Sequence, residues 1–445
     1  MSSPAPQDGS HRHVWQLAGP IILSNLSVPL LGMVDTAVVG HLPDPVYLGA
    51  VAIGSVLIHF LFWAFGFLRM GTTGLAAHAC GAEDGRELRE VLGRGLILAA
   101  LLAALLLLLQ PWLTAAGLAL MGAETGIDAE ARAYVEVRFW AAPATLANYV
   151  FWGWFLGLQD SRVPLIVTLT INGLNALLDV LFVYGLGMTA DGVALASVLA
   201  EYVGLTMAVM FARRRLRRMP GDWEPARLCN LRACRALLAV NGDLFLRTVG
   251  LLAAFAFFTA QGARFGELIL AANAVLLQFQ TFMAYGLDGF AHAAEAMVGK
   301  AIGAGRREAL QRSLATTLQW SAGTALVFSL GYALFGPELI RLLTGIEAVR
   351  ETALEYLPWV IATPLLSVWA FWLDGIFIGA TRSRDLRNGM LVSVFLIYLP
   401  AWALLSPWGN HGLWAALMTF MAARALSLAW FLRRQPLALA NTRKL

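Results

Sequence analysis

Long apolar runs recur from one end of this chain to the other, and they constrain its fold more than any other feature. Each run has about 20 or more residues, which is enough to cross a bilayer as a helix. Of all residues, 59% are hydrophobic and only 13% are charged, whereas about a quarter of the residues of a soluble domain are charged. The sequence therefore predicts an all-α polytopic membrane protein with twelve transmembrane helices. The expected spans are 14–41, 47–72, 92–118, 130–157, 163–187, 190–212, 236–262, 268–297, 312–336, 350–380, 388–407 and 411–432.

The positions of the basic residues predict the orientation in the bilayer. Lys and Arg on one side are Arg12, Arg162, the tail 433–444 and the groups at 86–94, 213–235, 300–312 and 382–387. The positive-inside rule makes this side cytoplasmic, so both termini are expected in the cytoplasm, with the protein in a bacterial-type cytoplasmic (inner) membrane. The first run is too long for a cleavable signal and is expected to be the first span. The run Arg213–Arg218 is explained by contact with lipid head groups, and no nucleic-acid partner is expected.

The two halves of the chain resemble each other at a constant offset of 222 residues. Residues 48–92 align with 270–314 without a gap, and Gly153 aligns with Gly375 in the same register. Each half holds six of the expected spans, so both halves enter the membrane in the same direction. We therefore expect two six-helix bundles related by a pseudo-two-fold axis along the membrane normal, an arrangement that suits alternating access.

A long hydrophilic connection at the midpoint divides the chain. The predicted organisation is an N-lobe at 1–212, a cytoplasmic linker loop at 213–235 and a C-lobe at 236–445. The N-lobe would hold the first six spans and the C-lobe the last six. We expect each lobe to form one helical bundle and the protein to be a monomer.

The first apolar run carries one acid and two prolines. Asp35 has no basic neighbour in the sequence, because none lies between Val14 and Gly40. A lone carboxylate at membrane depth is energetically costly, and by default it marks an ion, proton or substrate pathway. Pro20 and Pro29 remove backbone donors, so Pro20 is expected to kink this helix, whether the kink is fixed or moves.

A second intramembrane acid lies in the fifth expected span. Asn172, Asn175 and Asp179 are spaced i, i+3 and i+7 and therefore share one helix face. Ser197 in the next span is near enough to add a hydroxyl group. Together with Asp35 these oxygen atoms suit a shared proton or a hard cation such as Na⁺, with Asp35, Asp179 and Asn175 as the sodium ligands. The alternative is a polar clamp that holds neighbouring helices together.

Three acids of the second half are candidates for a separate role. Asp288 and Glu295 lie on one face of the eighth expected span, and Asp374 lies in the tenth. Acids inside membrane spans are functional candidates by default. They are candidates for binding a cationic substrate or for a second proton site, although Glu295 lies near the cytoplasmic end.

Basic residues inside the spans offer counter-charges. Arg69 and Arg138 in the first half either balance the carboxylates or extend towards the membrane surface. In the second half, Asp243 and Arg247 are spaced i, i+4, which permits a pair between them and favours a structural role.

Sequence motifs of enzymes do not stand out in this chain. We find no nucleotide-binding loop, no metal-ligand cluster and no Ser/His/Asp grouping. The sequence therefore predicts a protein that is not an enzyme and that needs no cofactor beyond a coupling ion, H⁺ or Na⁺.

Three segments resemble the multidrug and toxic compound extrusion (MATE) family of transporters. The first span, with Ala18-Gly19-Pro20 and Val34–Gly40, is similar to the first span of that family. The segments Tyr285–Glu295 and Asp374–Arg382 resemble the DinF (DNA-damage-inducible) branch. The resemblance extends over essentially the whole chain.

The resemblance implies a twelve-helix antiporter that exports small organic compounds, often cationic or amphiphilic, in exchange for protons or sodium ions. The cation site of the family's N-lobe carries over to Asp35, Asn175, Asp179 and, more loosely, Ser197. The family's bent first helix carries over to Pro20. The NorM branch places acidic coupling residues in the seventh and tenth spans, and this chain has no clear match to them. The sodium site of that branch is therefore not transferred.

Other functions remain open at this point. A flippase for lipids or lipid-linked precursors belongs to the same superfamily, although such flippases usually carry extra spans. A membrane-embedded enzyme that modifies lipids would need a clustered Asp/His/Glu motif. A gated channel would show downhill flux without exchange.

Overall fold

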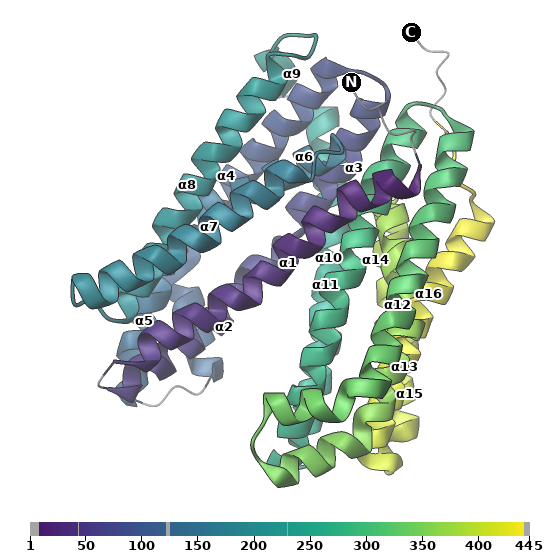
Figure 1. Cartoon of the computed structure of the whole chain (residues 1–445). Helices are drawn as coiled ribbons and strands as arrows, with labels where there is room; N and C mark the ends of the chain where they lie inside the picture. The colour runs from purple at the N-terminus through teal and green to yellow at the C-terminus, as the bar shows by residue number, and fades with distance from the viewer. Residues whose placement is uncertain (1–8, 43, 122–124, 229, 440–445) are drawn as a thin grey trace. The chain divides into compact units, whose positions relative to one another are not determined.

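The computed structural model of the protein describes residues 9–42, 44–121, 125–228 and 230–439. Every regular element within these ranges is a helix, as the sequence predicted (Figure 1). The elements are α1 His11–Gly40, α2 Pro45–Ala64, α3 Phe67–Gly81, α4 Gly85–Met121, α5 Thr125–Phe139, α6 Ala142–Gly157, α7 Arg162–Val180, η1 Leu181–Gly185, α8 Ala190–Leu216, α9 Pro225–Leu228, α10 Leu231–Ala263, α11 Glu267–Gly303, α12 Arg307–Leu343, α13 Glu347–Gly379, α14 Ser383–Leu391, η2 Val392–Tyr398, α15 Leu399–Leu405, η3 Ser406–Trp408 and α16 Gly409–Arg434.

The helices account for the twelve expected spans of a multi-pass membrane protein. Within the described residues, ten helical stretches are long and apolar enough to cross a membrane. The longest, Ser383–Arg434, has 52 residues and is interrupted by the short turn η3, so it supplies two spans. The helices α5 and α6 are each shorter than a span, but they follow one another across Trp140 and Ala141 and together supply another.

The chain folds into two compact units. The C-terminal unit contains residues from Leu238 onward together with the chain up to Ile22, and the N-terminal unit is Leu23–Leu237. The second boundary lies close to the end of the expected linker, 213–235. The first boundary differs from the expected lobes, because the start of α1 packs with the second half of the chain.

Aromatic side chains attach the start of α1 to the C-terminal unit. Leu17 is buried in a cluster that includes Phe290 of α11. Trp15 makes edge contacts with Phe290 at 5.4 Å and with Trp320 of α12 at 5.1 Å between ring centroids. The indole nitrogen Nε1 of Trp320 also donates a hydrogen bond of 3.1 Å to Nδ1 of His11. Rings of this size dominate packing energy, so the first three turns of α1 are fixed to α11 and α12.

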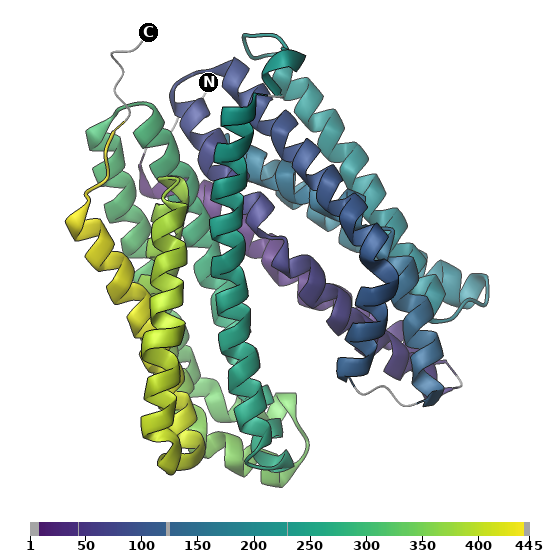
Figure 2. The same cartoon turned by 180° about the vertical axis from the view of Figure 1, so that it is seen from behind.

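The core of the C-terminal unit is rich in aromatic rings. Phe258 and Trp414 meet edge to face at 4.9 Å, and Tyr398 and Phe420 meet at 5.3 Å. Nε1 of Trp414 donates a hydrogen bond of 2.9 Å to the amide oxygen of Asn273. Figure 2 shows from behind the helices that carry these rings, α10 and the run from α14 to α16.

Close approaches between helices confirm the repeat of 222 residues. A Cβ atom on Gly153 of α6 would lie 2.3 Å from the carbonyl oxygen of Arg69 in α3. A Cβ atom on Gly375 of α13 would lie 2.3 Å from the carbonyl oxygen of Ala291 in α11. Each residue of the second contact stands 222 positions after its counterpart in the first. The two units therefore use glycine for the same helix contact.

The backbone conformation just after the ends of these helices is also the same in the two units. Gln159 and Thr381 have φ angles of 59° and 54°, and Glu83 and Gly305 have φ angles of 57° and 65°. Each residue follows the end of a helix and has the left-handed conformation that often terminates helices. Both pairs differ by 222 positions. Since non-glycine residues seldom adopt this conformation, the agreement supports a duplicated scaffold.

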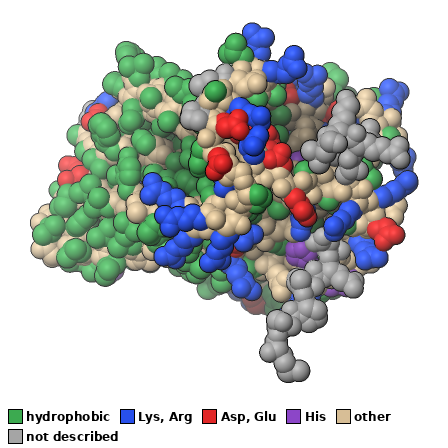
Figure 3. Space-filling model, turned by 90° about the horizontal axis from the view of Figure 1, so that it is seen from above, with side chains coloured by type: hydrophobic (Ala, Val, Ile, Leu, Met, Phe, Trp, Pro, Cys, Tyr) green, Lys and Arg blue, Asp and Glu red, His purple; other side chains and the backbone are tan. Residues whose placement is uncertain are grey.

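Basic side chains mark one end of the N-terminal unit. The exposed arginines at and after the end of α8 are Arg213, Arg214, Arg215, Arg217 and Arg218. Figure 3 looks onto the molecule from above and shows Lys and Arg side chains gathered on this face. Such a face fits the expected contact with anionic lipid head groups.

The expected linker begins with a segment that is held against α4. Arg89 of α4 is buried, and its guanidinium donates hydrogen bonds to the carbonyl oxygens of Leu216 and Pro220 at 2.7 Å and of Met219 at 3.0 Å. These carbonyl groups lie at and beyond the end of α8, where the regular hydrogen bonds of the helix end. Arg89 therefore terminates α8 and fixes the start of the linker.

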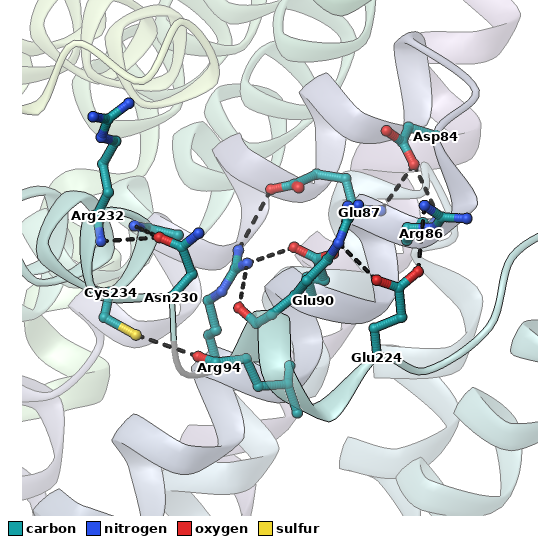
Figure 4. Close-up of polar contacts among 12 residues, drawn as sticks. Asp84, Arg86, Glu87, Glu90, Arg94, Glu224, Asn230, Arg232 and Cys234 are labelled. Atoms are coloured by element: carbon teal, nitrogen blue, oxygen red, sulfur yellow. Dashed lines mark hydrogen bonds and ion pairs between the residues drawn. The ribbon is translucent and has the colours of Figure 1, made fainter.

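A second arginine of α4 holds the next part of the linker (Figure 4). Arg94 pairs with Glu90 one turn earlier and donates a hydrogen bond of 3.0 Å to the carbonyl oxygen of Arg227 in α9. The Arg227 side chain reaches back to within 3.6 Å of Glu90. Arg86 and Glu224 add a pair at 3.3 Å. The linker is therefore attached to the N-terminal unit by buried as well as surface contacts.

Candidate functional site

The structure brings the two predicted acids of the N-terminal unit together. Asp35 lies in the part of α1 that belongs to this unit, and Asp179 lies in the last turn of α7. Their carboxyl groups are within hydrogen-bonding range of each other. Asp179 is completely buried, and the Oδ1 atom of each residue is buried without another hydrogen-bond partner. Two carboxyl groups that share a buried site repel each other when both are ionised.

Asn175 and Ser197, two further candidates from the sequence, lie beside Asp179. The Nδ2 group of Asn175 donates to Oδ2 of Asp179 at 3.3 Å and contacts Oγ of Ser197 at 3.2 Å. Oγ of Ser197 in turn donates to Oδ1 of Asn175 at 3.1 Å. Asn175 lies one turn before Asp179 on the face of α7 that packs on α8. The amide thereby orients the carboxyl group of Asp179.

Asn172 lies on the same helix face but has a different partner. Its Nδ2 group donates a hydrogen bond of 2.8 Å to Oγ of Ser27 in α1. Further along the chain, the hydroxyl of Tyr184 in η1 donates a second hydrogen bond to α1, to the carbonyl oxygen of Val38 at 3.0 Å. Asn172 and Tyr184 therefore connect α7 and η1 to α1 on either side of the Asp35–Asp179 pair.

The structure also reveals an acid that our interpretation of the sequence missed. Glu201 lies in the middle of α8, and its Oε2 atom accepts a hydrogen bond of 2.9 Å from Nδ2 of Asn148 in α6. Arg138 of α5 lies close enough to act electrostatically on Glu201 and on both members of the Asp35–Asp179 pair. The sequence did contain a signal for this residue, because Glu201, like Asp35, is an acid within an apolar run.

The charged residues of α10 have partners on other helices. Asp374 of α13 contacts both Arg247 of α10 and, at 2.7 Å, Arg424 of α16. Asp243 contacts Arg387 of α14 at 2.6 Å. The pair that the spacing of Asp243 and Arg247 permits is therefore replaced by others, because each faces an oppositely charged group on a neighbouring helix. A carboxylate held by two guanidinium groups is also poorly suited to bind a cation.

The other two acids of the C-terminal unit lie at different places. Asp288 of α11 is half-buried and lies within electrostatic range of Arg424, so it belongs with the charged group around Asp374. Glu295 is fully buried two turns further along α11, where Gly379 of α13 approaches its backbone. Asp288 therefore lies within electrostatic range of a partner of Asp374, and Glu295 lies two turns further along the helix.

A family comparison identifies the protein class. The family model MatE matches residues 20–181 and 246–402, which lie in both halves of the chain. The chain belongs to the MATE family. This confirms the resemblance found in the sequence and makes the protein a member of a family of multidrug efflux transporters, which handle small organic compounds.

Individual relatives agree with this assignment. The chain is 44% identical to DNA damage-inducible protein F of Escherichia coli (strain K12) over 426 residues, which cover 96% of this chain and 92% of the relative. It is 25% identical to a probable multidrug resistance protein NorM of Geobacillus kaustophilus, with 97% of each protein covered. Members of the MATE family are transporters, and neither relative is named as an enzyme, so the prediction that the chain is not an enzyme is confirmed.

Solved MATE structures share the fold. A MATE structure in complex with MaD5 gives a TM-score of 0.85 at 20% identity, with 96% of each chain covered. MATE structures in the straight and bent conformations give TM-scores of 0.85 and 0.84 with the same coverage. In the protein described here, α1 runs as one helix from His11 to Gly40 through Pro20 and Pro29 (Figure 1).

Proposed function

We propose that this MATE protein exports small organic compounds, cationic or amphiphilic in character, in exchange for protons that enter the cell. The proton would bind at the Asp35–Asp179 pair, with Asn175 and Ser197 orienting Asp179. The protein would act as a monomer in the bacterial inner membrane, with both termini in the cytoplasm. Access to the substrate would alternate between the two sides of the membrane.

The contact between the carboxyl groups of Asp35 and Asp179 carries this proposal. Two carboxylates that share a desolvated site repel each other strongly, and one bound proton removes the repulsion and supplies a hydrogen bond. Sodium is the second candidate for the coupling ion. Hard cations take roughly six or more oxygen ligands, whereas the amide oxygen of Asn175 is already engaged by Ser197. The donor set therefore favours the proton.

Coupling requires that the proton and the substrate bind with different strength in the two states of the transporter. We propose that α1 is the element that moves when the charge of the Asp35–Asp179 pair changes. Asp35 is part of α1, and Asn172 and Tyr184 attach the same helix to α7 and η1. Pro20 interrupts the backbone hydrogen bonds of α1 and is the proposed point at which the helix bends between states.

The test is export of ethidium, a permanent cation, from proteoliposomes under an imposed pH gradient and then under a sodium gradient. We expect the pH gradient to drive export and the variant Asp35→Asn to lose it. Asp44→Asn is the matched control, because Asp44 caps α2 with a hydrogen bond of 2.9 Å to the backbone of Val46 and asparagine caps equally well. Uphill ethidium export by Asp35→Asn would contradict the proposal. Export driven by a sodium gradient alone would show that sodium, and not the proton, is the coupling ion.

A further inference from the structure

A group of buried charges in the C-terminal unit has more positive than negative members. One oxygen atom of Asp374 in α13, Oδ2, accepts hydrogen bonds from Arg247 of α10 and, at 2.7 Å, from Arg424 of α16. All three residues are buried, and burying a charge is costly unless the charge is paired. Because one carboxylate balances only one of the two arginines, this charged cluster of Arg247, Asp374 and Arg424 retains one positive charge.

Two acids near the charged cluster do not cancel this positive charge. Asp243 lies one turn before Arg247 on α10, but it is already paired with Arg387 of α14 at 2.6 Å. Asp288 of α11 acts on Arg424 from a half-buried position. Solvent screens a charge in that position more than it screens the buried cluster. The arginines of the cluster therefore remain in excess.

The charged cluster also has unused hydrogen-bond donors. The Nε atoms of Arg247 and Arg424 are buried and have no hydrogen-bond partner among the residues that the structure describes. Arg424 is enclosed, since its side chain is 4% exposed, its guanidinium carbon lies 5.7 Å from the ring centre of Phe420 and its Nη1 group lies 3.5 Å from the sulfur of Met421. The side chains of Arg247 and Asp374 are 9% and 10% exposed. The cluster is therefore reached from the side on which these two residues lie.

The difference in exposure gives the two arginines different roles. Arg424 is the more deeply buried and is sufficient to balance Asp374. Arg247 then keeps a positive charge on the accessible side of the charged cluster. A guanidinium group has paired donors that match the oxygen atoms of a carboxylate or phosphate group. Since the helices around the cluster are apolar, a ligand that places an anionic group here would keep the rest of its structure among apolar groups.

We propose that the charged cluster is an anion-binding site, and that it takes the carboxylate, sulfonate or phosphate group of an amphiphilic compound. Arg247 contacts the anion, whereas Asp374 and Arg424 are positioning residues that hold Arg247 in place. The inference goes beyond the proposed function, because it adds an anionic class of ligand and does not depend on the coupling ion. Two sources supply such a group, a small organic anion and the head group of an anionic lipid, and the experiment separates them.

The experiment measures equilibrium binding of dansylglycine, a fluorescent carboxylate, to the purified full-length protein in a neutral detergent. The methyl ester of dansylglycine is the matched ligand, because it has the same ring system without the charge. We expect the acid to bind about tenfold more tightly than the ester. Displacement of the acid by phosphatidylglycerol but not by phosphatidylcholine would identify a lipid head group as the source of the anion. Binding of the acid that neither lipid displaces would identify a small organic anion.

Variants test the role of each arginine. Arg247→Gln leaves Asp374 balanced by Arg424, so the protein should fold, bind the acid about tenfold more weakly and bind the ester as before. Arg424→Gln should also weaken binding of the acid, because Asp374 then takes up the charge of Arg247. Arg434→Gln is the matched control, since it removes the same charge from α16 at an exposed site that stacks on Trp430 at 4.1 Å. It should change neither affinity.

Two results would overturn the inference. One is equal affinity of the wild-type protein for the acid and the ester, a comparison that needs no variant to fold. The other is an Arg247→Gln protein whose affinity for the acid falls no more than that of Arg434→Gln. Because binding is measured without transport, a protein that fails to export ethidium but binds the acid through Arg247 loses the proposed function and retains the anion site.

Discussion

Replacing Gly375 by alanine should destabilise the C-terminal unit, and the structure gives the size of the effect. The added Cβ would lie 2.3 Å from the carbonyl oxygen of Ala291 and 3.0 Å from its carbonyl carbon. Carbon atoms in ordinary contact are about 3.5–4.0 Å apart, so α11 and α13 would have to separate by roughly 1 Å. The clash is with backbone, which cannot rotate out of the way as a side chain can.

The expected magnitude is the difference of two effects. Overpacking a core costs about 1–3 kcal/mol, and contact with backbone places Gly375→Ala at the upper end. Alanine recovers about 1 kcal/mol of helix propensity relative to glycine. The net loss is therefore about 2 kcal/mol, which corresponds to a melting temperature lower by about 4–8 °C for a unit of this size.

The assay is thermal unfolding in detergent followed by tryptophan fluorescence. Gly323→Ala in α12 is the matched control, because a Cβ there meets no atom within 4 Å. It should raise the melting temperature slightly through helix propensity. Gly153→Ala should lower it as Gly375→Ala does, since the two glycines make the same contact in the two units. A Gly375→Ala protein that melts at or above the wild-type temperature would refute the reasoning.

Two further predictions concern buried arginines. Asp374→Asn leaves Arg247 and Arg424 without their shared carboxylate, so it should cost about 3–5 kcal/mol of stability and lower the melting temperature; unchanged melting would show that other groups balance both arginines. Arg89→Met removes the donors that hold the start of the linker, so trypsin should cut the basic run after α8 faster than in the wild type. Arg132→Met, which removes a surface arginine paired with Asp128 at 3.5 Å within α5, should not change the cleavage rate, and equal rates in both variants would contradict the role of Arg89.

Much of the scaffold could be predicted because it depends on strong, repeated signals. Apolar runs long enough to cross a bilayer marked the spans, and the offset of 222 residues placed Gly153 and Gly375 in corresponding contacts. The cluster of Asp35, Asp179 and Asn175 was also predictable. A polar group inside an apolar run must find a partner, and few such groups were available.

Other features depend on tertiary packing, which one-dimensional patterns do not contain. Asn172 and Asp179 share a helix face, but seven residues correspond to about 10 Å of helix rise, so Asn172 reaches Ser27 instead. Asp243 and Arg247 have a spacing that permits pairing, yet partners on neighbouring helices displaced that contact. Spacing along a helix therefore predicts a shared face more safely than it predicts a contact.

The association of the start of α1 with the second half of the chain could not be predicted for a related reason. Leu17 and its neighbours form an apolar face that would fit either bundle. The start of α1 associates with the C-terminal unit because Trp15 packs against Phe290 and Trp320. This contact depends on the relative positions of three helices. Hydropathy indicates that a helix face is buried, but it does not identify the residues against which that face packs.

Both places where the chain passes from one unit to the other lie inside helices. The first, at Ile22 and Leu23, lies within α1, and the second, at Leu237 and Leu238, lies within α10. A loop can take up a rotation at little cost, whereas a helix resists both bending and twisting because its hydrogen bonds must stretch. Any reorientation of the two units therefore strains both helices at these points. This strain would oppose the reorientation, so the stiffness of α1 and α10 would limit how far the units can rotate.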